Sequence, residues 1–194
     1  MAGNCSLWRS FLAGAVIAAG AAFGSAESAE APTGFSITST TFADGGMMPV
    51  RTAYTKSEKF PNCVGRNVSP QLSWSKPYAG VRSYALVMID LEDIQNDTDL
   101  VVYGIPANVT SFAEGEFGKP SDKFVGGRGS RGDMVWRGMC PPPGTAPHHY
   151  AFIVRGTDLD PKALPPGLDI AELDAKLKGH IRGQAAIVGK FVHP

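Results

Sequence analysis

Runs of apolar and alternating residues along the chain predict a β-rich fold. Residues 34–42 alternate between polar and apolar positions, as a strand with one buried face does. Four later runs are rich in β-branched and aromatic residues and end at Gly, Pro or Asp: 81–90, 100–106, 149–157 and 185–192. The first three of these runs are apolar almost throughout. We therefore expect them to be central strands that are covered on both faces.

One segment has the periodicity of a helix instead. Residues 168–181 follow a Pro-Pro-Gly stop signal, and Asp169 and Glu172 stand in capping-box spacing at their start. The apolar face of this helix would consist of Ile170, Leu173, Leu177 and Ile181. The pattern predicts a C-terminal amphipathic helix.

The composition fits a single domain with many turns. The chain has 194 residues, of which 43% are hydrophobic, so it can bury one core. Its 23 glycines and 15 prolines are typical of a β-protein with frequent turns. Residues 114–138 are rich in glycine and charge, and we predict an extended surface loop there with one short helical turn.

The first 31 residues do not belong to this domain. Arg9 is the only charge before an apolar run of small residues from Phe11 to Phe23, and the sequences before residues 27 and 32 suit signal peptidase. The run is shorter than the ~20 residues of a membrane span. We predict a secretory signal over 1–31, cleaved after residue 26 or 31, and one domain over 32–194. The mature protein would be periplasmic or secreted, without a stable membrane anchor.

The mature chain has nearly equal numbers of basic and acidic residues, which gives no electrostatic reason to expect nucleic acid as a partner. Cys5 leaves with the signal, and Cys63 and Cys140 remain. In an exported protein an even pair is most simply a disulfide. Two separate buried thiols are the first alternative. A nucleophile pair of Cys140 with His148 or His149 is the second, and the prolines after Cys140 leave no helix N-terminus to lower its pKa.

Five blocks of sequence then resemble one known family. They are NVSPQLSW (67–74), AGVRSYALVMID (79–90), VVYGIPANVTSFAEG (101–115), CPPPGTAPHHYAFIV (140–154) and IRGQAAIVGKF (181–191). In order and character they resemble the phosphatidylethanolamine-binding protein family, and most closely its bacterial Raf kinase inhibitor-like branch. The resemblance covers about Phe35 to Phe191. It implies a mainly β fold: a β-sandwich with a large central sheet, a Pro-rich pocket loop and a small anion-accepting pocket.

The resemblance also implies a set of pocket residues. The family's strand-ending Asp corresponds to Asp90, its Pro-rich loop to residues 141–144 with Pro142, and its His-x-Tyr to His148 and Tyr150. His148 and Tyr150 are two apart on a strand and share one face, while His149 faces the other side. Asp99 stands where the family has a second histidine. We expect these residues to bind a small polar or anionic ligand, or a side chain of a partner protein.

Acidic residues around the predicted pocket leave alternatives open. Asp90, Glu92 and Asp99, with the neighbouring histidine, could bind a divalent cation, although the segment lacks the glycine and terminal Glu of an EF-hand loop. The charges could equally face water as a solvated loop.

The sequence contains no catalytic motif such as Gly-x-Ser-x-Gly, a phosphate loop or His-Glu-x-x-His. A hydrolase would need His148 as base, Asp90 or Asp99 to orient it, and a nucleophile that the sequence does not identify. We therefore expect a non-enzymatic binding protein without a cofactor. The resemblance implies modulation of a kinase or protease by binding, and an exported location favours a protease or another envelope protein.

Overall fold

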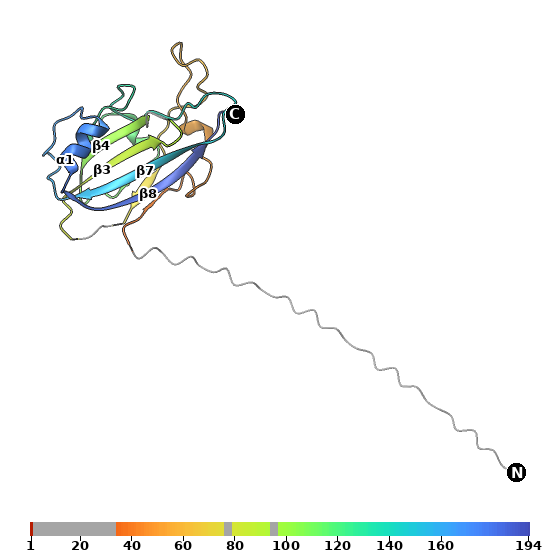
Figure 1. Cartoon of the computed structure of the whole chain (residues 1–194), viewed down its shortest axis with the longest axis horizontal. Coiled ribbons are helices and arrows are strands. Elements are labelled where there is room, and N and C mark those ends of the chain that lie inside the picture. Colours follow the sequence, from red (N-terminus) through yellow and green to blue (C-terminus); the bar gives the residue numbers. More distant parts are fainter. Residues whose placement is uncertain (2–33, 76–78, 94–96) are drawn as a thin grey trace. The chain divides into compact units, whose positions relative to one another are not determined.

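Strand β3 (Ser83–Asp90) lies at the centre of the structure, a computed structural model that describes residues 1, 34–75, 79–93 and 97–194 (Figure 1). It belongs to a five-stranded antiparallel sheet with the order β6-β4-β3-β7-β8. The other members are β4 (Thr98–Pro106), β6 (Val125–Gly126), β7 (His148–Thr157) and β8 (Ile181–Phe191). The predicted central strands are therefore confirmed in the middle of the sheet.

A second, smaller sheet has three short antiparallel strands in the order β1-β2-β5. Its strands are β1 (Ile37–Thr38), β2 (Leu72–Trp74) and β5 (Ser111–Phe112), and two 3-10 turns occur in the loops, η1 (Val50–Thr52) and η2 (Glu116–Gly118). The large and small sheets enclose the main core. The mainly β sandwich with a large central sheet is confirmed.

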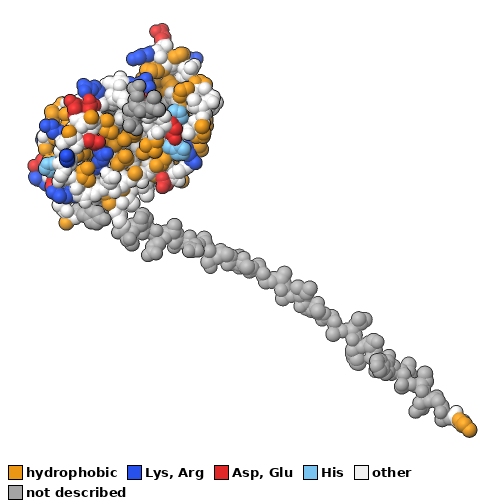
Figure 2. Space-filling model, viewed as in Figure 1, with side chains coloured by type: hydrophobic (Ala, Val, Ile, Leu, Met, Phe, Trp, Pro, Cys, Tyr) orange, Lys and Arg blue, Asp and Glu red, His pale blue; other side chains and the backbone are white. Residues whose placement is uncertain are grey.

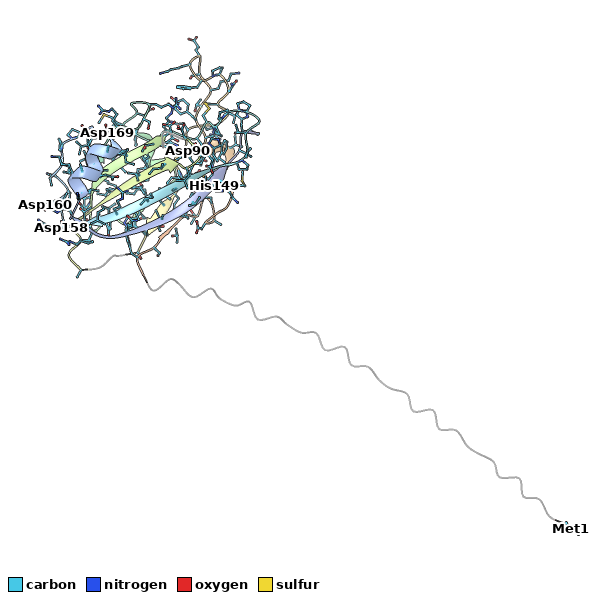
Figure 3. All side chains as sticks on the ribbon, in the orientation of Figure 1. Met1, Asp90, His149, Asp158, Asp160 and Asp169 are labelled. Atoms are coloured by element: carbon cyan, nitrogen blue, oxygen red, sulfur yellow. A yellow bond between two sulfur atoms is a disulfide. The ribbon has the colours of Figure 1, made fainter. Side chains whose placement is uncertain are left out.

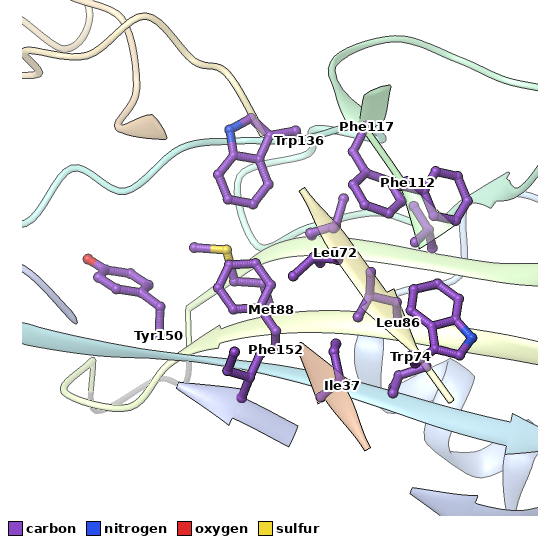
Figure 4. Close-up of a cluster of buried hydrophobic side chains, with 14 of the residues drawn as sticks. Ile37, Leu72, Trp74, Leu86, Met88, Phe112, Phe117, Trp136, Tyr150 and Phe152 are labelled. Carbon is purple, nitrogen blue, oxygen red and sulfur yellow. The ribbon is translucent and has the colours of Figure 1, made fainter. Parts of the chain in front are cut away.

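Side chains of β3 alternate between two cores. Leu86 and Met88 belong to the main cluster, together with side chains of the small sheet such as Leu72, whereas Ala85 and Val87 contact a second cluster. Figure 4 shows Leu72, Leu86 and Met88 in the main cluster. Both faces of the sheet are thus covered, which explains why the central strands are apolar at nearly every position.

Helix α1 (Ile170–Leu177) covers the second face of the sheet through Leu173 and Leu177. The predicted capping box is present: the Asp169 side chain accepts a bond from the Glu172 amide, and the Glu172 side chain accepts one from the Asp169 amide. The predicted extension of the helix to Ile181 is wrong. Gly179 adopts a left-handed φ of 83°, which ends the helix, and Ile181 begins β8 with its side chain exposed.

Two other predictions need correction. In the predicted strand 34–42 only β1 forms a ladder, because Ser39 and Thr40 bond to Gln71 through side chains instead. The segment 114–138 contains the predicted helical turn, η2, but it is not simply a surface loop. It places Phe117, Phe124 and Trp136 in the core, where their side chains are buried in the main cluster.

Cys63 and Cys140 form a disulfide, as predicted, with an S–S distance of 2.00 Å. Cys140 is therefore not available as a nucleophile. The predicted signal peptide falls almost wholly on residues 2–33, outside the described residues, and it stays a prediction. None of the helices in the described ranges is long and apolar enough to span a bilayer.

We expect loss of the disulfide to lower stability strongly. The bonded cysteines are 77 residues apart, and loop-closure entropy for such a separation corresponds to about 4.5 kcal/mol. The double variant Cys63→Ala/Cys140→Ala should therefore unfold at lower denaturant, with a free energy of unfolding reduced by about 2–5 kcal/mol. Chemical denaturation of both proteins, with and without reductant, measures this. Equal stability of the two proteins under oxidising conditions would contradict the expectation.

Candidate functional site

A pocket of about 280 Å³ lies where β3 ends and β7 begins. All the predicted site residues line it: Asp90, Asp99, Pro142, His148 and Tyr150. Asp90 pairs with Tyr150 in the ladder between the two strands, which brings the strand-ending aspartate next to the His-x-Tyr segment. In Figure 3 the labels of Asp90 and His149 mark this end of the sheet. The structure thus brings the predicted residues together.

His148 and Asp90 form the closest polar contact of the pocket. The His148 Nδ1 lies 2.8 Å from the Asp90 Oδ2, and both side chains are largely buried. The imidazole stacks on the Tyr150 ring with a centroid distance of 6.3 Å. The hydrogen bond to Asp90 and the stacking on Tyr150 together fix the ring orientation of His148. Its other ring nitrogen is then available to a ligand.

Tyr150 lies at the boundary between the apolar core and the pocket. Its ring belongs to the main cluster, and in Figure 4 its hydroxyl points away from the neighbouring apolar side chains. Burial raises the pKa of the Tyr150 hydroxyl, and the nearby carboxylates of Asp90 and Asp99 raise it further. The phenol therefore keeps its proton and can donate a hydrogen bond.

Asp99 lines the pocket because of an irregularity in the sheet. Met88 pairs with Leu100 and the next residue, Ile89, pairs with Thr98, so Asp99 is an extra residue in β4. Such a bulge changes the direction of a side chain relative to a regular strand. In a regular strand Asp99 would point to the face opposite Leu100, away from the main core. The bulge is consistent with its place in the pocket.

The carboxyl group of Asp99 is buried without a close partner. Its side chain is 8% exposed, and the Arg137 Nε lies 3.9 Å from its Oδ1. Among the hydrogen bonds of the described residues, none reaches the Asp99 carboxylate. Burial raises the pKa of Asp99 well above that of an ordinary aspartate, and the charges of Asp97 and Asp90 add to this, while Arg137 lowers it.

Sequence reasoning missed Arg137, whose side chain is only 6% exposed. Its guanidinium carbon lies 4.0 Å from the centroid of the Tyr54 ring and 4.3 Å from that of Phe60, and its Nη1 donates to the Asp133 Oδ2 at 3.1 Å. One signal was available. Phe60 and Arg137 each stand three residues before a cysteine of the predicted disulfide, so the disulfide itself places them near each other.

Sequence reasoning also missed Arg131, Asp93 and Asp97, which line the pocket as well. The Arg131 side chain donates two hydrogen bonds to the Asp97 Oδ2, at 3.1 and 2.9 Å. Because the loop before β4 has no regular pattern of apolar residues, its contacts could not be read from periodicity.

A second polar group lies beside the pocket. The exposed His149 does not line the pocket, and its Nδ1 lies 2.7 Å from the Glu92 Oε1. Figure 2 shows acidic and histidine side chains next to one another on the visible face of the molecule. Atoms of Asp90, Glu92 and His148 that could ligate a metal lie within 4.8 Å of one another.

Comparisons with known proteins agree on one family. The sequence model of the family "Phosphatidylethanolamine-binding protein" matches residues 38–192. A crystal structure titled as E. coli YbcL, a new member of the mammalian PEBP family, superimposes with a TM-score of 0.72. It shares 26% sequence identity, and the match covers 81% of this chain and 98% of that one.

Two relatives are also similar in sequence over most of the chain. A UPF0098 protein of Aquifex aeolicus is 31% identical over 156 residues, which cover 77% of this chain and 91% of that protein. A Mycobacterium tuberculosis protein with the name "Putative lipoprotein LppC" is 33% identical over 156 residues, or 80% of this chain and 71% of its own length.

We expect the Asp99→Asn substitution to stabilise the protein at neutral pH. Because the pKa of Asp99 is raised on folding, its contribution to stability is full below the pKa of an unfolded aspartate. The contribution is lost as the pH rises toward the folded value. Asparagine does not titrate, so the stability gain should grow as the pH rises above about 4, the pKa of an unfolded aspartate, and reach about 1–3 kcal/mol. Denaturation midpoints across this pH range measure the gain.

Asp133→Asn is the matched control, because Asp133 also pairs with Arg137 but does not line the pocket. It should show no gain that increases with pH. A pH-independent difference between Asp99→Asn and the unchanged protein would contradict the expectation.

Proposed function

Because the chain belongs to the phosphatidylethanolamine-binding protein family, we propose that it is an exported, non-catalytic binding protein. Its pocket accepts a small polar ligand or the side chain of a partner protein. The observation that carries this proposal is the convergence of Asp90, His148 and Tyr150 on one small pocket at the end of the central sheet.

The size and lining of the pocket support a small polar ligand. Its volume of about 280 Å³ is at the lower end of the ~300–1,000 Å³ typical of small-molecule sites. Tyr150 offers a hydroxyl donor, His148 a ring nitrogen and Asp99 a carboxyl group, while Pro142 and Phe60 supply apolar walls. A protein partner would be bound through one inserted side chain, and a protease or another envelope protein fits an exported location.

The contacts of His148 support binding rather than hydrolysis. A hydrolase would need a hydroxyl or thiol bonded to the imidazole as a nucleophile. Within the described part of the chain the imidazole of His148 bonds to Asp90, and the sulfur of Cys140 is bonded to Cys63.

Export is supported by two independent observations. The disulfide between Cys63 and Cys140 is typical of an oxidising compartment. A relative that aligns with 80% of this chain carries the word lipoprotein in its name.

A divalent cation is the second candidate ligand. Asp90, Glu92 and His148 can each offer one ligand atom, and these atoms lie within 4.8 Å of one another. Oxygen and imidazole ligands suit borderline metals such as Zn²⁺. This site would lie at the edge of the pocket, since Glu92 is exposed.

NMR titration of the purified protein with phosphoethanolamine tests the proposal. We expect the resonances of His148 and Tyr150 to shift and saturate. His148→Ala should weaken binding at least tenfold, because it removes a ring that lines the pocket. His149→Ala is the matched control: its side chain bonds to Glu92 and does not line the pocket, so binding should change less than threefold.

A parallel titration with Zn²⁺ or Ca²⁺ separates the two candidates. Saturation by metal alone, with loss of the effect in Glu92→Gln, would favour the cation site over the proposed ligand. Equal effects of His148→Ala and His149→Ala would argue against the pocket as the binding site.

A further inference from the structure

The pocket contains more carboxylates than cationic side chains. Four aspartates line it, Asp90, Asp93, Asp97 and Asp99, against the two arginines Arg131 and Arg137. His148 offsets this charge only when its ring is protonated. The lining alone therefore favours a positively charged group over a negatively charged one.

Both arginines already have acidic partners. Arg131 bonds to Asp97 through two nitrogens, at 3.1 and 2.9 Å. Arg137 bonds to Asp133, at 3.1 Å, and its guanidinium stacks on two aromatic rings. An anionic ligand would have to compete with these carboxylates for the same donors, and it would also meet the charge of Asp90.

Asp99, in contrast, has no close donor among the residues that the structure describes. Its side chain is more than nine-tenths buried, and the Arg137 Nε is 3.9 Å away, beyond hydrogen-bond distance. No hydrogen bond within the described ranges ends on its carboxylate. A carboxylate accepts several hydrogen bonds, and burying one without them is unfavourable. A donor group on a ligand would supply the missing bonds, and Asp99 lines the pocket into which that ligand enters.

We propose that the pocket is selective for an organic cation, a primary ammonium or guanidinium group, and that Asp99 accepts hydrogen bonds from it. This inference rests on the proposed function and names the class of ligand. Asp90, oriented by its bond to His148, supplies a second negative charge at the same site.

Two sources can present this chemistry. One is a small free amine, and the other is a lysine or arginine side chain of a protein partner. Ethylammonium and methylguanidinium represent the free cations, and the peptides Ala-Lys-Ala and Ala-Arg-Ala, with blocked ends, represent the side chains. Blocked Ala-Gln-Ala is the neutral control, and sodium phosphate and acetate are the anionic controls.

The test compares these probes by NMR titration in buffer with a metal chelator, following His148 and Tyr150. We expect the cationic probes to saturate the pocket and the phosphate, acetate and neutral peptide to bind at least tenfold more weakly. Asp99→Asn should weaken the cationic probes at least tenfold. Asp133→Asn, which removes the other partner of Arg137, should change their affinity less than threefold.

The outcomes separate this inference from the proposed function. If phosphate saturates the pocket and the cations do not, the charge selectivity is wrong and the binding function stands. Equal binding of the cations to Asp99→Asn and the unchanged protein would also overturn the role of Asp99. If no probe shifts the pocket resonances, the charge selectivity is wrong, and the titration with phosphoethanolamine decides the proposed function separately. The comparison of cationic, neutral and anionic probes on the unchanged protein tests the charge selectivity even if a variant fails to fold.

Discussion

The attachment of two loops to each other is the constraint on which the pocket depends. The loop that carries Phe60 and the loop that carries Arg137 have almost no regular secondary structure, yet both line the pocket. The disulfide between Cys63 and Cys140 joins them covalently. Near their bases Asn67 bonds to the second loop through both ends of its side-chain amide, at Trp136 and Gly138.

Close backbone packing adds to this attachment. A Cβ atom on Gly138 would lie 2.2 Å from the Thr52 carbonyl oxygen, and one on Gly65 would lie 1.9 Å from that of Ala53. Only glycine allows the chain segments to approach in this way. The stacking of Arg137 on Phe60 therefore follows from contacts made elsewhere. The buried guanidinium of Arg137 is thus positioned by loops and not by a helix or strand.

Strands and helices could be predicted from the sequence where buried positions follow a regular pattern along the chain. β3, β4 and β7 are buried on both faces and appear as apolar runs, and the capping box marks the start of α1. The two- and three-residue strands of the small sheet have too few residues for a pattern, and pairing with distant segments defines them. The helix ended early because Gly179 takes a left-handed conformation that periodicity does not reveal.

Some residues of the candidate site could likewise be predicted from the sequence, and others could not. Asp90, His148 and Tyr150 could be found through motifs, since each has a fixed place relative to a long strand. The direction of the Asp99 side chain depends on a bulge, and a bulge is a property of the pairing between two strands. Asp99 is also buried with the Arg137 Nε 3.9 Å away, beyond hydrogen-bond distance. A local arrangement that is unfavourable for stability and opens into a pocket is typical of a functional position. The burial of Asp99 without a close donor in the described residues and the excess of carboxylates in the pocket thus support the same proposal. A hydrogen-bond donor from outside the chain would bind at Asp99.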